Sequence, residues 1–176
     1  MPQPLLITLI VIAGIIGLWL LLLVVNLIFV FSYLAIFRKH KNAIAVILFT
    51  KYENIGKLIA IIKQSNIEID GKLEANYKEI PQNAFENPES EVYIKAKDTL
   101  SYLKDEIVFL VNQHPELLEN PEFVQARNNV NDADLIYRSN VVMYNADVLG
   151  YNYWIRFLPC RFIFKLFRYK KKEIIS

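Results

Sequence analysis

The sequence predicts an all-α protein in which an N-terminal transmembrane helix is followed by an antiparallel bundle of three long helices. Two observations lead to this prediction. Residues 1–37 contain no Asp, Glu, Lys or Arg. Beyond them, apolar residues recur at alternating spacings of three and four along three stretches of the 176-residue chain, which is the heptad pattern of helices that pack side by side.

The anchor is expected in residues 1–37. A hydrocarbon layer of about 30 Å is crossed by roughly 20 helical residues, so residues 5–25 suffice and the helix continues to about residue 37. A cleaved signal peptide is the alternative, but it would have a basic start and a shorter apolar run. Basic residues follow the span at Arg38, Lys39 and Lys41 and none precedes it. The positive-inside rule therefore predicts a short outer N-terminus and residues 38–176 in the cytoplasm, where a lone Cys160 suits a reducing compartment.

The helical bundle is expected in residues 38–159. Its first helix runs to about residue 65, and its apolar seam is Ala45, Leu48, Tyr52, Ile55, Ile59 and Ile62. An irregular connection is expected over 66–88, where Pro81 and Pro88 interrupt regular structure. The second helix follows a Ser90 cap and ends before Pro115; its seam is Tyr93, Ala96, Leu100, Leu103, Ile107, Leu110 and His114. Helices that alternate in direction would leave the end of the third helix far from the membrane.

The third helix is expected from Pro121, behind an Asn120 cap, to about residue 157. Tyrosine recurs there every seventh residue, and two of the three are followed by Asn. We interpret this repeat as helix packing in which the Asn side chains bridge helices; a ligand site is the less favoured alternative. The predicted seam residues are Tyr137, Val141, Tyr144, Asn145, Val148, Tyr151, Asn152 and Ile155. Asp134 falls on the same face and is expected to set the register, paired with Arg138 or Lys104, a binding carboxylate being the alternative.

Residues 160–176 form a basic and aromatic tail. Residues 161–176 hold six basic and one acidic side chain, whereas residues 42–160 hold 11 basic and 17 acidic ones. Such a tail suits an anionic cytoplasmic leaflet; a solubilising tail that covers the end of the bundle is the alternative. The acidic body argues against nucleic acid. The expected membrane-surface residues are Arg38, Lys39, Lys41, Arg161, Phe162, Phe164, Lys165, Phe167, Arg168, Lys170, Lys171 and Lys172.

Two segments, "HPELLENPEFVQAR" (114–127) and "YNADVLGYNYWIRFLP" (144–159), resemble the LemA family. The resemblance includes the spacing of the two Tyr-Asn pairs, and the matching residues are Pro115, Glu116, Leu117, Phe123, Tyr144, Asn145, Tyr151, Asn152, Ile155 and Pro159. Gly56, Lys57, Asp134 and Val141 depart from the family pattern, so the chain looks like a divergent member. The resemblance implies a bacterial inner-membrane protein with a cytoplasmic helical bundle, no cofactor and no established catalytic activity. One branch of the family is associated with magnetosome membranes, which suggests a role in membrane organisation.

Motifs for nucleotide binding, metalloprotease or serine hydrolase chemistry are absent from the sequence. We therefore expect no enzyme activity, cofactor or metal. The leading hypothesis is a homo-oligomeric, single-pass protein that organises or remodels membrane and contacts the anionic leaflet. A membrane-tethered adaptor that recruits a protein, such as a protease or a signalling protein, is the alternative.

Overall fold

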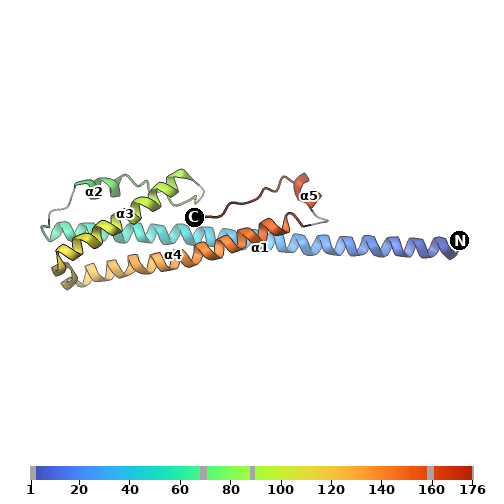
Figure 1. The fold of residues 1–176 in the computed structure, drawn as a ribbon, viewed down its shortest axis with the longest axis horizontal. Helices are drawn as coiled ribbons and strands as arrows, with labels where there is room; N and C mark the ends of the chain where they lie inside the picture. Colours follow the sequence, from blue (N-terminus) through green and yellow to red (C-terminus); the bar gives the residue numbers. More distant parts are fainter. Residues whose placement is uncertain (1–2, 68–70, 88–89, 158–160, 176) are drawn as a thin grey trace. The chain divides into compact units, whose positions relative to one another are not determined.

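The computed structural model describes residues 3–67, 71–87, 90–157 and 161–175, and within these ranges every regular element is helical (Figure 1). The elements are α1 (Gln3–Gln64), α2 (Gly71–Lys78), α3 (Glu91–Gln113), the 3-10 helix η1 (Pro115–Glu119), α4 (Pro121–Trp154) and α5 (Arg161–Leu166). The predicted all-helical class is thereby confirmed. The expectation for Cys160 and the family match at Pro159 lie outside the described residues.

The N-terminal helix α1 is long and apolar enough to cross a membrane, by length and composition. The side chains of residues 3–22 are all exposed. At about 1.5 Å per residue these twenty residues extend for about 30 Å, which is the thickness of the hydrocarbon layer.

The chain divides into two compact units. We call Met1–Arg38 with Tyr144–Ile174 the anchor unit, and Lys39–Met143 with Ile175–Ser176 the middle unit. Both α1 and α4 contribute residues to each unit.

The expected helix caps are present in the middle unit. The Ser90 hydroxyl oxygen accepts a hydrogen bond from the Tyr93 amide at 3.1 Å. The Asn120 side chain accepts from the amides of Glu122 and Phe123, at 2.9 and 3.2 Å. These bonds satisfy amide groups that a helix start leaves without an intrahelical partner, so the starts of α3 and α4 are as predicted. Helix α4 ends at Trp154, slightly earlier than expected.

Within the middle unit, α4 runs antiparallel to α1. Asn129 donates a hydrogen bond to Asn54 at 3.1 Å. Further along α4, the Asp134 carboxylate lies 2.6 Å from the Lys51 ammonium. Further still, the Asn140 side-chain oxygen lies 3.4 Å from a ring nitrogen of His40. The residue number therefore rises along α4 as it falls along α1.

Helix α3 runs in the same direction as α1, and this differs from the expected alternation. One cavity is lined by Leu48 together with Lys97, and another by Leu58 together with Val111, so the two helices advance together. The reason is that the segment between them returns along α1 before α3 starts. Near the beginning of this segment Glu74 binds Lys63 at 2.8 Å, and near its end Asn87 accepts from Lys41 at 3.1 Å.

The buried faces of the middle unit follow the predicted seams with local shifts. On α3, Tyr93, Ala96, Leu100, Leu103 and Ile107 are buried as predicted, whereas Leu110 and His114 are half-buried and Val111 is buried instead. On α1, Tyr52 is only half-buried, and its ring stacks on Tyr77 of α2 with centroids 4.6 Å apart. Of the other predicted seam residues on α1, Leu48, Ile55, Ile59 and Ile62 are buried and Ala45 is half-buried. Ile44, Lys51 and Leu58 are buried one residue before predicted positions.

Gly56 is required by the ring stack on α2. A Cβ atom added at this position would overlap the hydroxyl group of Tyr77. Alanine favours a helix over glycine by roughly 1 kcal/mol, whereas overpacking costs roughly 1–3 kcal/mol. We expect Gly56→Ala to lower the free energy of unfolding by about 1 kcal/mol and to increase amide exchange in α2. Denaturant unfolding measures the free energy of unfolding, and hydrogen exchange measures the protection of the α2 amides. Gly71→Ala is the control, because no atom lies within 4 Å of its added Cβ; equal behaviour of the two variants would contradict the prediction.

Candidate functional site

The C-terminal part of the chain packs on the anchor helix directly after the exposed apolar stretch. Buried Val30 of α1 lies in a common apolar core with buried Tyr151, Ile155 and Phe164. Leu23, Leu27, Tyr33, Leu34, Trp154 and Tyr169 pack around it. The covered part of α1 thus begins at residue 23, next to the exposed residues 3–22.

The same antiparallel direction of α4 against α1 holds within the anchor unit. The Trp154 ring stacks on Phe29 with centroids 4.5 Å apart, and the Tyr144 and Phe37 centroids are 4.7 Å apart. Between these pairs the backbone of Gly150 lies close to the Tyr33 ring, since a Cβ added at Gly150 would be 2.6 Å from a ring carbon. The tail therefore follows a helix that ends beside the anchor, and the expectation of a distant helix end is wrong.

The second Tyr-Asn pair binds the backbone of the tail. Asn152 donates to the Lys172 carbonyl at 2.8 Å and accepts from the Lys172 amide at 2.9 Å. The Tyr151 hydroxyl donates to the Lys170 carbonyl at 3.2 Å, and burial raises the pKa of this phenol. The predicted role of Asn152 in bridging helices is thereby corrected: the carboxamide holds the C-terminal segment.

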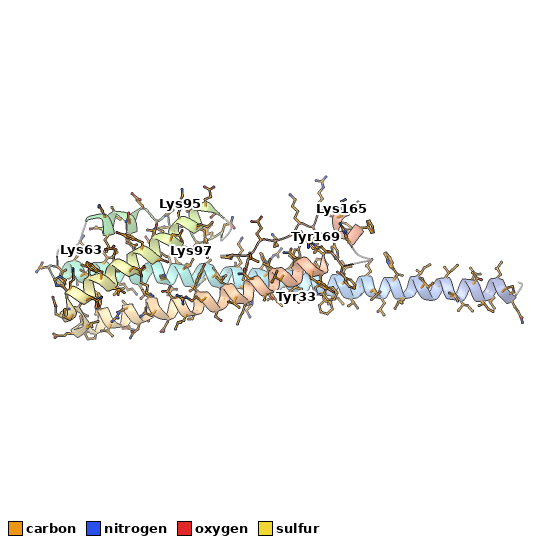
Figure 2. All side chains as sticks on the ribbon, in the orientation of Figure 1. Tyr33, Lys63, Lys95, Lys97, Lys165 and Tyr169 are labelled. Atoms are coloured by element: carbon orange, nitrogen blue, oxygen red, sulfur yellow. The ribbon has the colours of Figure 1, made fainter. Side chains whose placement is uncertain are left out.

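A mixed basic and aromatic surface lies on α5 and the residues after it. Phe162, Leu166 and Phe167 are 74%, 79% and 68% exposed. The exposed basic residues are Arg161, Lys165, Arg168, Lys170 and Lys171; Figure 2 shows Lys165 extending from α5 on the side of Tyr169. Phe164 corrects the prediction, because it is buried in the core and is unavailable to a membrane surface.

The remaining predicted membrane-surface residues differ in exposure. Arg38 and Lys39 are exposed, and Lys41 is half-buried with its ammonium bound to Asn87. Lys172 is half-buried, and its ammonium lies 5.4 Å from the centroid of the Phe37 ring, a cation–π distance.

The predicted packing face of α4 is only partly buried. Tyr144, Val148, Tyr151 and Ile155 are buried, whereas Tyr137, Val141, Asn145 and Asn152 are half-buried. The Tyr137 hydroxyl shares a hydrogen bond of 3.2 Å with the Tyr93 hydroxyl, and burial raises the pKa of Tyr137.

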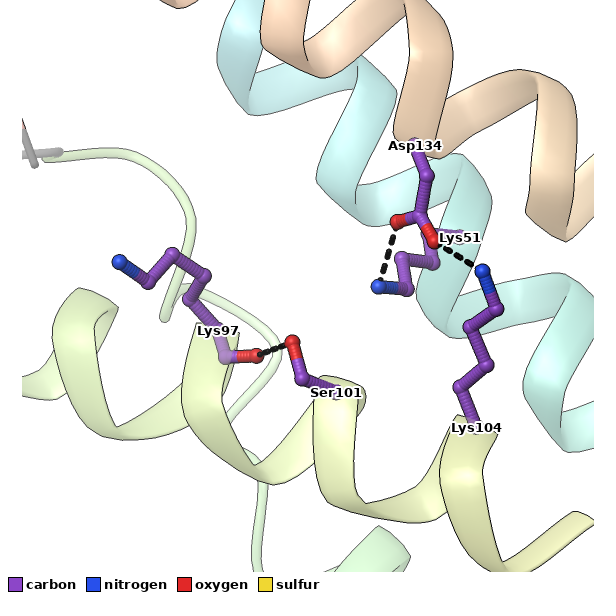
Figure 3. Close-up of polar contacts among 5 residues, drawn as sticks. All are labelled: Lys51, Lys97, Ser101, Lys104 and Asp134. Carbon is purple, nitrogen blue, oxygen red and sulfur yellow. Dashed lines mark hydrogen bonds and ion pairs between the residues drawn. The ribbon is translucent and has the colours of Figure 1, made fainter.

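Asp134 is the centre of an ion-pair cluster in the middle unit. Its two carboxylate oxygens bind the Lys51 and Lys104 ammonium groups at 2.6 and 2.5 Å, as Figure 3 shows. The Lys51 side chain is only 6% exposed. Burial raises the pKa of Asp134, but the two lysines outweigh it and the net pKa is lowered. The predicted partner Lys104 is confirmed. Lys51 was missed because the sequence pattern placed the seam one residue away.

Groups of three or more His, Cys, Asp and Glu side chains that could hold a metal ion do not occur among the described residues. The arrangement offers apolar surface, exposed cations and fixed ion pairs, which suit contact with lipid, protein or anions. Comparison of the chain with protein-family models, curated proteins and solved structures gives no match.

Removal of the Asn152 side chain is expected to release the tail. Asn152→Ala deletes two hydrogen bonds to Lys172, each contributing roughly 1 kcal/mol. A loss of about 2 kcal/mol corresponds to a factor of roughly thirty, so we expect trypsin to cleave after Lys170–Lys172 about thirty times faster. Mass spectrometry of the timed digest gives the rate. Asn128→Ala, at an exposed position of α4, is the control, and cleavage at the wild-type rate in Asn152→Ala would contradict the assignment.

Loss of the Asp134 charge is expected to destabilise the protein strongly, because Lys51 would remain charged and buried. Asp134→Asn should lower the free energy of unfolding by about 3 kcal/mol, and Lys51→Met with Asp134→Leu should restore most of it. The folded-state pKa lies below the usual 3.8, so this stabilisation is complete above pH 3.8 and is lost as the pH falls through the folded pKa. Denaturant unfolding from pH 7 to pH 2 measures both effects. Asp132→Asn, exposed on the same helix, is expected to change nothing; an equal loss there would refute the assignment.

Proposed function

We propose that this chain is a non-enzymatic, single-pass membrane protein that touches the bilayer at two places and organises or remodels it through self-association. The apolar start of α1 is the anchor, and the surface of α5 with the following basic residues is the second contact. In this proposal, α1, α3 and α4 of the middle unit form a three-helix bundle in the cytoplasm. The resemblance of the Tyr-Asn pairs to the LemA family supports a bacterial inner membrane as its location.

The observation that carries the proposal is the packing of α5 beside the exposed apolar stretch. Phe164 fixes α5 to the core that includes Val30, and the exposed residues 3–22 end close by along α1. When residues 3–22 occupy the hydrocarbon layer, α5 lies at the level of the lipid headgroups. Aromatic side chains and long cations favour that level, and each Lys or Arg adds roughly 1 kcal/mol on an anionic leaflet.

The orientation follows from the basic residues. Arg38, Lys39 and the tail cations all follow the apolar stretch in sequence, and basic residues are retained on the cytoplasmic side. The N-terminus would therefore face outward. The excess of acidic residues between 42 and 160 would be repelled by the anionic leaflet, which favours contact through the basic ends.

Contact of α5 with lipid is testable by spin labelling. A label at position 162, in the full chain with Cys160→Ser, is expected to collide with membrane-dissolved oxygen more often than with aqueous nickel complex. The preference should increase in liposomes of phosphatidylglycerol over those of phosphatidylcholine, because the surrounding cations bind the anionic leaflet. A label at Lys95, exposed on α3, should remain aqueous in both. Aqueous accessibility of position 162 in both lipids would refute the second contact.

Self-association is supported by an exposed apolar stripe on α4 in the middle unit. Leu135 and Val142, seven residues apart, are 66% and 69% exposed, and their neighbours Ile136 and Met143 are each 51% exposed. A heptad spacing of exposed apolar residues is suited to pairing with an identical helix of a second copy. We propose that two copies meet along this stripe.

Charged substitutions on the stripe are expected to separate the copies. Leu135→Glu with Val142→Glu should reduce the native mass of the detergent-extracted particle to that of one chain, because carboxylates would be buried at the interface. Ile94→Glu, at an exposed apolar position on α3, should leave the mass unchanged. The same pair of substitutions should abolish changes of liposome shape seen by electron cryomicroscopy. A monomeric wild-type particle would refute self-association.

The adaptor is the second candidate, and the same stripe is compatible with it. A wild-type particle that contains one copy and one different protein in fixed ratio would favour the adaptor over the homo-oligomer. Loss of that protein in Leu135→Glu with Val142→Glu would place its binding site on α4.

A further inference from the structure

We infer that the end of α4 carries a binding site for the headgroup of an anionic phospholipid, built around Arg156. The site is an open pocket of about 540 Å³, and it is lined by Leu149, Asn152, Tyr153, Arg156 and Phe157. All of these residues belong to the anchor unit. The inference rests on the proposed insertion of residues 3–22 in the bilayer, and it adds a lipid contact that is separate from the surface of α5.

The end of α4 lies at the level of the lipid headgroups when residues 3–22 cross the bilayer. The Asn26 side chain of α1 donates to the Trp154 carbonyl at 3.4 Å. Asn26 follows the exposed stretch by four residues, which is a rise of about 6 Å along a helix. The headgroup layer is about 5–8 Å deep on each side of the hydrocarbon. The Arg156 amide donates to the Tyr153 carbonyl at 3.1 Å, so the chain keeps turning at this depth through Arg156.

An aromatic cluster lies at the site and joins it to the anchor helix. The Tyr153 and Phe157 centroids are 6.0 Å apart, and the Trp154 centroid lies 5.5 and 5.4 Å from them. Trp154 in turn stacks on Phe29 of α1. The outer part of the site is uncovered, since Tyr153 is 60% exposed and Leu149 is 63% exposed. Tyr and Trp favour the boundary between lipid and water, so this exposed apolar surface is suited to lipid.

Arg156 supplies the positive charge of the site. Its side chain is exposed, and no ion pair involves it among the residues that the structure describes. The anchor unit has eight basic and two acidic residues, whereas the middle unit has 12 basic and 16 acidic ones. An anionic headgroup is therefore attracted to the anchor unit, and the cation of a zwitterionic headgroup is opposed by the same excess of charge.

A phospholipid phosphate matches Arg156 in charge and geometry. The phosphate diester has one negative charge and two non-bridging oxygens, and a planar guanidinium can donate to both oxygens at once. Tyr153 precedes Arg156 by one turn, and its hydroxyl offers another donor on the same face. Asn152 forms only a wall of the site, because its carboxamide already binds the Lys172 main chain. The aromatic rings then meet the glycerol and the first carbons of the acyl chains.

The test uses the full chain with Trp19→Phe in non-ionic detergent, because Trp154 is then its only tryptophan. Dioctanoylphosphatidylglycerol is titrated against dioctanoylphosphatidylcholine while Trp154 fluorescence is recorded. A saturable change with the glycerol lipid is expected, and little change with the choline lipid. Arg156→Gln should weaken the apparent affinity about ten-fold, the effect of one lost charge-assisted pair. Arg161→Gln removes the same charge from an exposed position of α5 outside the pocket and should keep the wild-type affinity.

Two further arms separate geometry and acyl contact from charge. Arg156→Lys keeps the charge but loses the planar fork, so its affinity should lie between those of the wild type and Arg156→Gln. Glycerophosphoglycerol, which is the headgroup without acyl chains, should compete only weakly, because it leaves the aromatic rings uncovered.

Equal responses to the two lipids, equal losses in Arg156→Gln and Arg161→Gln, or competition by glycerophosphoglycerol as strong as that by the lipid would overturn the site. The spin label at position 162 reports the proposed function separately. A lipid-exposed label there, together with no saturable response to the glycerol lipid, would overturn this site alone. A response that depends on Arg156 supports the site even where that label is aqueous.

Discussion

The antiparallel contact of α4 with α1 is the constraint on which the rest of the structure depends. In the middle unit it brings Asp134 to Lys51, and in the anchor unit it brings Trp154 to Phe29. The first of these contacts creates the ion-pair cluster around Asp134. The second places α5 against the part of α1 that follows the exposed apolar residues. Both depend on the return of the chain between α1 and α3, after which α4 runs opposite to α1 within each unit.

Polar contacts define the alignment of the helices, while apolar burial supplies most of the stabilisation. Buried Leu and Ile side chains tolerate small sliding, because apolar attraction has little directionality. The Asn54–Asn129 bond and the Lys51–Asp134 pair join particular turns, and a shift by one turn would leave buried polar groups unsatisfied, which is costly. The positions of Lys51 and Lys104 around Asp134 are therefore tied to the contacts that align the helices.

The helical class, the apolar start and the capped starts of α3 and α4 could be predicted from the sequence, because each depends on local composition and spacing. The direction of α3 could not, since it depends on the path of the connection and on tertiary contacts such as Lys41–Asn87. Phe164 shows a similar limit, because alternating aromatic and basic residues do not reveal which ring meets Val30. Lys51 was missed for a related reason. Heptad spacing locates a helix face to within about one residue, and Lys51 is one residue away from the predicted seam position Tyr52.

The two hydrogen bonds between the Asn152 side chain and Lys172 use only the main-chain amide and carbonyl of Lys172. Attachment through these bonds therefore does not depend on the exposed side chains of Lys170 and Lys171, whereas Phe164 and Tyr169 hold the preceding residues through their rings. Mutation or chemical modification could therefore reverse the charge at Lys170 or Lys171 without breaking these hydrogen bonds. Affinity for a charged surface and attachment to the scaffold are thus separable traits, which evolution or a protein engineer can adjust one at a time.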